Sequence, residues 1–334
     1  MSSEISEILD PDASIVIIFL RILIGIVSVI GNGVLLVIFL KFKTFRSQYS
    51  NWLISLLAFS DFIIGTGLLV KAVYSVFKSH IPGGEYDRRL CAIIGAPQVL
   101  GVTCSQVMFI SMATDRLIAV KMKTQHGLVN LKFKITVIVA SWIISSVFVF
   151  FFLFWTLPSG PSRQCSVGAV AGMAFLFVYV IGGLLISVLI FSIYIYAIRI
   201  LKKTVQGGEV MTSNRTLKTQ QRVFRSISLL LVFYFVFCVI PLTVAIVALV
   251  SNLDEDTLGL ISVFIGLGAD VNSCVGIFIY LSRHEEVKKH FKILITFNQA
   301  NNQKIALSPI ARINNIKIAK LTVLNPHVLP WRRS

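Results

Sequence analysis

The chain has 334 residues, of which 56% are hydrophobic and 14% are charged. About a quarter of the residues of an ordinary soluble domain are charged, so this composition excludes a soluble enzyme and a disordered chain. Its 31 Lys and Arg residues against 15 Asp and Glu residues give a net charge of +16. In so apolar a chain, this basic excess points first to a membrane, and we expect no nucleic-acid partner.

Seven stretches of the chain are long and apolar enough to cross a membrane as helices. A helix needs about 20 predominantly apolar residues to cross the hydrocarbon core, because all its backbone polar groups must be bonded inside the segment. The expected spans are residues 13–40, 50–77, 91–120, 135–157, 168–201, 223–250 and 257–282. The sequence therefore predicts an all-α membrane protein, a seven-transmembrane helix bundle over residues 13–282.

Two segments follow the seventh span. Residues 283–297 place apolar side chains at helical spacing among basic ones, which predicts a short amphipathic helix on the membrane surface. Residues 298–334 are polar and basic with Asn-rich stretches, which predicts a disordered tail. The sequence shows no internal repeat and no second domain.

The basic residues of the connections predict how the bundle is oriented. Residues 1–12 carry four acidic and no basic residues, so we expect them to be extracellular. In that orientation, cytoplasmic segments hold 25 of the 31 Lys and Arg residues and extracellular segments hold four. We therefore expect a multi-pass plasma-membrane protein with a cytoplasmic C-terminus, in contact with membrane lipids.

Several spans carry charged or conformationally special residues. An ionisable residue in a bilayer is expensive, so Asp61 in the second span is a functional candidate by default. The third span opens with Cys91 and closes with Arg116, 25 residues later, a helical rise of about 37 Å that puts the two at opposite membrane faces. In the sixth span, Pro241 is expected to kink the helix because it removes one backbone hydrogen bond.

Together these features resemble the rhodopsin-like family of G-protein-coupled receptors over about residues 20–295. The matching features, in chain order, are Gly31-Asn32, LAFSD ending at Asp61, Cys91, Asp115-Arg116-Leu117, Trp142, Phe235 to Pro241 and Asn272 to Tyr280. Val239 stands where the family has a tryptophan, and Gly276-Ile277 replaces its Asn-Pro. With these departures the chain is similar to nematode serpentine chemoreceptors, and the sx class is the nearest of them.

The resemblance implies a receptor that binds an extracellular small-molecule or peptide ligand between the outer halves of the helices. It further implies a heterotrimeric G protein as the cytoplasmic partner and a disulfide between Cys91 and Cys165. Arg116 would be held by Asp115 in the silent state and would contact the G protein in the active state. The family's acid in the sixth span is replaced by Gln221, so we expect appreciable basal signalling.

Three further residues are assigned to activation by the same resemblance. Pro241 is the expected hinge of the sixth helix, and Tyr280 is the retained tyrosine of the seventh-span motif. Because the family's tryptophan is missing, Phe235 is the expected transmitting side chain, packed beneath the ligand. Val239, in the place of that tryptophan, is expected to border the ligand pocket.

The remaining pocket candidates are Gln98, Lys71 and Asp270. Gln98 stands where amine receptors of this family have an aspartate, and Asp270 stands where opsins have a lysine, so both of these ligand classes are disfavoured. Lys71 and Asp270 lie on helices that are neighbours in this fold. Two interpretations stay open: a buried ion pair, or a pair that borders the cavity and for which a charged ligand competes.

A polar group around Asp61 resembles the family's sodium site. Its members are Asp61, Ser105, Asn272 and Ser273, while Gly276 replaces a further asparagine. A sodium ion and a water-filled polar cluster are both compatible with this set. We expect no other cofactor.

Other classes of function compete with this interpretation. An orphan or neuropeptide receptor of the same superfamily is the first alternative. A seven-helix transporter or ligand-gated channel is the second, although the inverted repeats or broken helices expected of transporters are not evident. An enzyme is not expected, because the sequence contains no HExxH, nucleophile elbow, Walker loop or Cys/His metal set.

Overall fold

The computed structural model describes residue 12 and residues 14–79, 85–121, 131–206, 214–251, 253 and 255–296. Its elements are α2 (Ile15–Lys41), α3 (Lys43–Arg46), α4 (Tyr49–Ser79), β1 (Tyr86–Asp87), α5 (Arg88–Lys121), α6 (Leu131–Trp155), β2 (Pro161–Ser162), α7 (Val167–Val170), α8 (Met173–Gln206), α9 (Asn214–Tyr234), the π segment η1 (Phe235–Val239), α10 (Ile240–Val250) and α11 (Glu255–Arg283). A last helix covers residues 285–296. The predicted tail at 298–334 lies outside the described residues.

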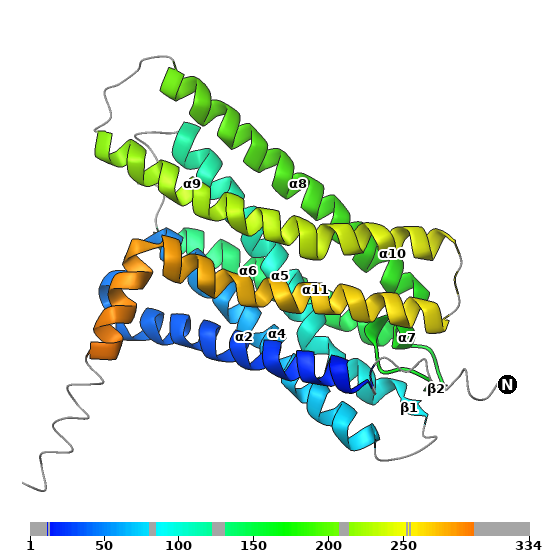
Figure 1. Ribbon diagram of the computed structural model, residues 1–334. Coiled ribbons are helices and arrows are strands. Elements are labelled where there is room, and N and C mark those ends of the chain that lie inside the picture. Colours follow the sequence, from blue (N-terminus) through cyan, green and yellow to red (C-terminus); the bar gives the residue numbers. More distant parts are fainter. Residues whose placement is uncertain are drawn as a thin grey trace, which may run out of the picture.

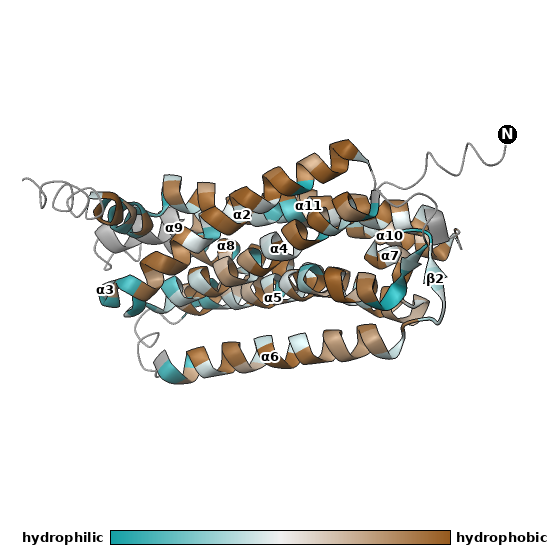
Figure 2. Cartoon of the chain, turned by 90° about the horizontal axis from the view of Figure 1, so that it is seen from below, coloured by the Kyte–Doolittle hydropathy of each residue, from teal (hydrophilic) through white to brown (hydrophobic). Residues whose placement is uncertain are grey.

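Seven helices of the described chain are long and apolar enough to span a membrane, as the sequence predicts. They run side by side as one bundle, in which α9, η1 and α10 follow one another as the sixth span (Figure 1). Hydrophobic residues run along most of their length (Figure 2). Many large apolar side chains are exposed, which suits contact with lipid. The chain is therefore a multi-pass membrane protein with a seven-helix bundle.

Small residues let the first three long helices approach closely. A Cβ atom at Gly25 of α2 would lie 2.8 Å from Leu69 of α4, and one at Gly101 of α5 would lie 2.4 Å from Ile64. Membrane helices commonly pack through such small residues, because backbone contact replaces the hydrophobic effect between them. The contacts of α2, α4 and α5 thus form a tight group, whereas α6 lies at the edge with 11% of its span buried (Figure 2).

The fifth span begins later than predicted. The sequence predicts a helix from residue 168, but α7 ends at Val170 and α8 begins at Met173. At the break, a Cβ atom on Gly172 would lie 2.1 Å from the carbonyl oxygen of Thr156, so the chain packs directly on the end of α6. Ser166 caps α7 by accepting a hydrogen bond from the Ala169 backbone.

The predicted amphipathic helix is present at residues 285–296 and lies across one end of the bundle (Figure 1). Val287 is fully buried there. Glu286 accepts hydrogen bonds from Gln48 at 2.8 Å and from Asn51 at 2.9 Å, which fastens the helix to the start of α4. We call this end, which also bears Arg116, the arginine end, and the opposite end, which bears the Cys91–Cys165 bond, the disulfide end.

Candidate functional site

A cavity opens into the bundle at the disulfide end, with about 1090 Å³ of empty space including that open to solvent. Polar side chains gather along one part of its wall, namely Arg21, Lys71, Gln98 and Asp270. Most of the remaining wall is apolar, including Leu176, Val180, Leu242, Ala245, Leu249 and Leu258. An apolar cavity with a few convergent polar groups is the usual form of a small-ligand site.

The disulfide between Cys91 and Cys165 is present, as the resemblance implies, and both cysteines are buried. Beside it, β1 and β2 form a two-stranded antiparallel pair. Arg88 donates to the carbonyl oxygens of Pro161 at 3.1 Å and Ala169 at 3.0 Å. These bonds fix the connection between α6 and α8 over the disulfide end.

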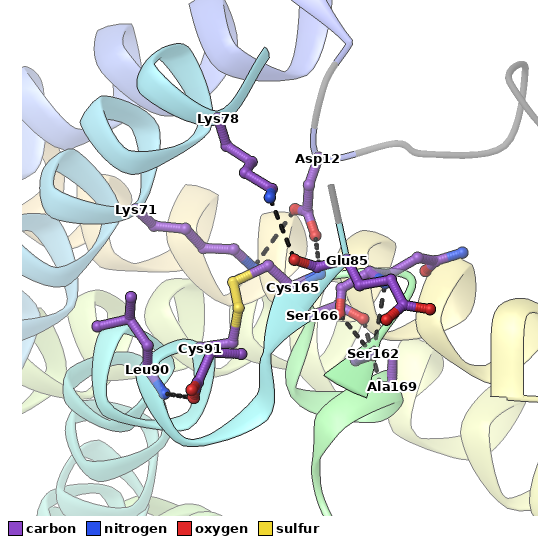
Figure 3. Close-up of a disulfide and its surroundings, with 12 residues drawn as sticks. Asp12, Lys71, Lys78, Glu85, Leu90, Cys91, Ser162, Cys165, Ser166 and Ala169 are labelled. Atoms are coloured by element: carbon purple, nitrogen blue, oxygen red, sulfur yellow. Dashed lines mark hydrogen bonds and ion pairs between the residues drawn. A yellow bond between two sulfur atoms is a disulfide. The ribbon is translucent and has the colours of Figure 1, made fainter. Parts of the chain in front are cut away.

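Asp12, which precedes the first helix, reaches into this end of the bundle and is fully buried. Its carboxylate lies 2.5 Å from Arg21. It also lies 3.5 Å from Lys71 and accepts a hydrogen bond from the Cys165 backbone at 3.1 Å (Figure 3). Burial acts to raise the pKa of Asp12, but the Lys71 and Arg21 charges outweigh burial, so the pKa lies below its ordinary value.

The ion pair considered between Lys71 and Asp270 does not form. Lys71 pairs with Asp12, while Asp270 accepts a hydrogen bond from Gln98 at 2.8 Å. A Cβ atom at Gly266 would lie 3.0 Å from the Gln98 amide, so this glycine leaves the room that Gln98 occupies. Lys71, Gln98 and Asp270 nevertheless all line the cavity.

The expected positions of Phe235 and Val239 are wrong. Phe235 is 46% exposed on the outside of the bundle, and Val239 is not part of the cavity wall, where Cys238 stands instead. The cause is the π segment Phe235–Val239 directly before Pro241, because its extra residue shifts the faces of the helix relative to a regular α-helical count. Tyr234, 1% exposed, takes the inward position.

Tyr234 joins the cavity to the middle of the sixth span. Gln106, part of the cavity wall, donates a hydrogen bond to the Tyr234 hydroxyl at 3.2 Å, and this hydroxyl lies 2.8 Å from Ser187 of α8. Sequence reasoning missed this group, because only the π segment turns Tyr234 inward. If one extra residue is allowed in the helical turn before Pro241, the same spacing places Tyr234 on the inward face.

Asp61 stands in a polar cluster at mid-bundle. Ser105 donates to its carboxylate at 3.3 Å, and the Ser28 hydroxyl donates to its backbone carbonyl at 2.9 Å and lies 3.0 Å from that of Ser273. The side chain of Asn272 makes no hydrogen bond with any described residue, so hydrogen bonds join three of the four members predicted. No group of three His, Cys, Asp or Glu suited to a metal ion is found in the part of the chain described.

The oxygen groups around Asp61 suit a hard cation only in part. A Cβ atom at Gly276 would lie 3.6 Å from the Asp61 carboxylate, so the glycine leaves open the side on which the family carries an amide. Asp61 and the Ser105 hydroxyl would be the protein ligands of a sodium ion here. Ser273 donates its own hydroxyl to the Asp270 carbonyl at 2.7 Å.

Arg116 forms an ion pair with the neighbouring Asp115 at the arginine end. Its Nε is buried and has no partner among the residues described, and the same holds for the hydroxyl of Tyr280. Tyr194 of α8 donates to the Phe224 carbonyl at 2.6 Å, tying α8 to the sixth span at this end. The side chain of Gln221 lies outside the described residues.

Two charged residues of the disulfide end were not singled out from the sequence. Arg21 carried a usable signal, because it is a cation within an apolar span, as Lys71 is. Asp12 carried none, because it stands among other acids in a segment expected to be an extracellular terminus. Only the fold brings its carboxylate to Arg21.

The comparisons with known proteins agree with this architecture. No curated protein is similar enough in sequence to match the chain. A family model of the serpentine type 7TM GPCR chemoreceptor Srsx matches residues 25–295, from the first span through the helix that follows the seventh. This is a receptor family and not an enzyme family, and it is the sx class to which the motifs pointed. The chain belongs to the serpentine type 7TM GPCR chemoreceptor Srsx family.

Proposed function

We propose that this chain is a plasma-membrane chemoreceptor that binds an extracellular ligand in the cavity at the disulfide end and activates a heterotrimeric G protein at the arginine end. The disulfide end is extracellular in this proposal, as the distribution of Lys and Arg predicts. The family supports the coarse activity, and the cavity supports the place of binding.

One observation carries the proposal, namely the hydrogen bond from Gln106 in the cavity wall to Tyr234 at the start of the π segment. A ligand that moves Gln106 changes the environment of a buried hydroxyl held also by Ser187. Single π turns inside helices are rare and frequently lie at functional sites, because the ladder of hydrogen bonds is weakened there. The sixth span can therefore adjust between the cavity and the arginine end.

At the arginine end, the proposal assigns G-protein contact to Arg116. Ligand binding would shift the balance between two packings of the bundle, and only the packing favoured by the ligand would free Arg116 from Asp115. Pro241 follows η1 in the half of the sixth span that faces the cavity. Tyr194 of α8 bonds the sixth span at Phe224, in the half toward the arginine end. Motion of the sixth span relative to α8 therefore connects the two ends.

A cell assay with a promiscuous G protein tests this function. Small molecules and peptide fractions are screened for ligand-dependent nucleotide exchange, and an N-terminal epitope is stained on intact cells. Ala245→Leu, which fills the cavity, should lower potency at least tenfold. Ala248→Leu, in the same helix and equally buried but outside the cavity wall, is the matched control and should leave potency unchanged.

The competing classes give different results in the same cells. Activation by peptides alone would favour a neuropeptide receptor over a small-molecule chemoreceptor. Ligand-evoked current or flux without nucleotide exchange would support a channel or transporter. An intracellular N-terminal epitope would overturn the proposed orientation.

A further inference from the structure

Arg21 and Lys71 form a cationic pair in the wall of the cavity, and this dibasic site is occupied by a carboxylate of the chain itself. Arg21 is 2% exposed and Lys71 is 5% exposed. Asp12 supplies the carboxylate from outside the helices, reaching Arg21 at 2.5 Å and Lys71 at 3.5 Å. The site is thus built to bind a carboxylate, whatever molecule carries it.

The binding capacity of the two cations exceeds what Asp12 uses. Arg21 contacts Asp12 through Nη2, while its Nη1 is buried without a partner among the residues described. A guanidinium can hold a carboxylate through two parallel hydrogen bonds, one from each of two nitrogens. In Arg21, the Nη1 donor is not used in this way. Lys71, at 3.5 Å, is beyond the usual hydrogen-bond distance of about 2.7–3.2 Å.

The charges at the disulfide end favour a ligand carboxylate that replaces that of Asp12 over one that binds in addition to it. Arg21 and Lys71 carry two positive charges, and the buried acids Asp12 and Asp270 complete the set. A third anion added to this set would need a further counter-charge among buried groups, which is costly. Replacement of the Asp12 carboxylate by a ligand carboxylate leaves the local charge unchanged.

The rest of the cavity indicates what the ligand carries besides its acid group. The cavity wall beyond the polar side chains is formed mainly by aliphatic residues of α8, α10 and α11. Such a surface binds an apolar tail. An organic acid with an apolar tail matches both parts of the cavity, whereas a cationic ligand would meet the two cations at its polar end.

We propose that the ligand of this cavity is an amphipathic organic acid whose carboxylate binds Arg21 and Lys71 by displacing the carboxylate of Asp12. This rests on the proposed function only in taking the cavity as the ligand site. Displacement also breaks the hydrogen bond between Asp12 and the Cys165 backbone. Ligand binding therefore separates the Asp12 carboxylate from the disulfide-bonded connection.

Chemical rescue of Asp12→Ala tests the carboxylate site without knowledge of the natural ligand. The purified full-length protein in lipid nanodiscs is titrated with sodium acetate while the thermal midpoint is measured. The variant should have a lowered midpoint that acetate restores, with half-saturation at a concentration at least tenfold lower than any effect on the wild type. Sodium chloride at equal ionic strength and acetamide, a neutral isostere, should not restore it.

Two variants serve as controls. The double variant Asp12→Ala/Arg21→Gln should lose the rescue, because the guanidinium is gone. Asp87→Ala removes an exposed carboxylate at the same end that accepts from the Leu90 backbone but faces no cationic pair, and acetate should not act on it. If Asp12→Ala does not fold, Asp12→Asn replaces it in the same series.

Acetate that does no more than chloride, or a rescue that persists without Arg21, overturns the proposal. The readout is independent of signalling. Rescue in a protein that activates no G protein would keep the carboxylate site and remove the receptor function. Ligand-dependent exchange without rescue would do the reverse.

Discussion

The two ends of the bundle hold their ion pairs in different ways. At the disulfide end, Asp12 binds Arg21 of α2, Lys71 of α4 and the backbone of Cys165, so one buried carboxylate joins three separate segments. At the arginine end, Asp115 and Arg116 are neighbours on one helix, and their pair ties no two segments together. The first pair therefore joins separate segments of the fold, whereas the second joins neighbours on one helix.

Arg21→Met should have the largest effect, because it leaves the buried Asp12 carboxylate with Lys71 alone. Removing one member of a buried ion pair costs about 3–5 kcal/mol of folding free energy. A thermal midpoint measured in nanodiscs should fall strongly, and surface expression should fall with it. Arg89→Met, an exposed arginine at the same end, should leave both unchanged; equal losses in the two variants would show that Asp12 is not anchored by Arg21.

The junction between the two ends is the second place to perturb. Pro241 has no N–H for the carbonyl of Phe237, and a Cβ atom on Gly268 of α11 would lie 2.2 Å from that oxygen. Gly268→Ala should therefore push α11 away from η1 and cost about 1–3 kcal/mol by overpacking. Gly182→Ala, with open space around its Cβ, is the matched control and should be neutral or stabilising; similar midpoints for the two would contradict the close approach.

Asp115→Asn should separate signalling from stability. Loss of the charge frees Arg116, so basal nucleotide exchange should rise about fivefold, a shift of about 1 kcal/mol between the two packings. The thermal midpoint should fall less than it does for Arg21→Met, since the Asp115–Arg116 pair joins neighbours on one helix. Asp12→Asn should instead lower the midpoint, because it weakens the contacts of Asp12 with Arg21 and Lys71. A basal rate unaltered by Asp115→Asn would remove the proposed lock.

Hydropathy predicted the seven spans because the thickness of a bilayer imposes a length on every crossing helix. The helix at 285–296 was predictable for a related reason, since its apolar side chains recur at helical spacing. The π segment was not, because nothing in the composition of Phe235–Val239 distinguishes it from an α-helical turn. The sequence therefore predicts Phe235 as the inward-facing side chain, whereas the structure has its neighbour Tyr234 in that position.

The charges within the spans were predictable as unusual, but their partners were not. An ion pair between Lys71 and Asp270 was one of two interpretations left open, and it rested only on the neighbourhood of their helices. The actual partner of Lys71 is Asp12, which comes from a segment before the first helix. Such a contact depends on the position of Asp12 in the folded chain, and no local sequence pattern predicts it.

A smaller effect is expected from sodium at Asp61, in the middle of the bundle between the two ends. If sodium binds there, a concentration of about five times its dissociation constant should stabilise the protein by about 1 kcal/mol relative to choline. Asp61→Asn should abolish the difference, while Asp87→Asn should keep it. Equal midpoints in sodium and choline for the wild type would favour the water-filled cluster, which agrees with the absence of bonds from Asn272 to the described residues.

The smallest effects come from pH, and they differ between the ends. Because the pKa of Asp12 is lowered in the folded protein, the carboxylate of the unfolded chain takes up a proton at a higher pH than that of the folded chain. The contribution of Asp12 to stability is therefore full above the ordinary pKa of 3.8 and is lost as pH falls below it. At the arginine end, burial lowers the pKa of His284 below 6.5, with Glu286 opposing and Arg116 adding to the shift. The neutral imidazole is favoured in the folded protein, so stability from His284 is lost at milder acidity, as pH falls from 6.5 toward the pKa of the folded state.

Midpoints measured from pH 7.5 to pH 3 should separate the two residues. The difference between wild type and Asp12→Asn should stay constant down to about pH 5 and shrink as pH falls through 3.8, where the Asp12 carboxylate of the unfolded wild-type chain takes up a proton while that of the folded protein is still ionised. His284→Gln should instead lessen the loss of stability that starts near pH 6.5. If the Asp12 difference shrank already near pH 6, the carboxylate would not be held by its two cations, and the disulfide end would be no more firmly fastened than the arginine end.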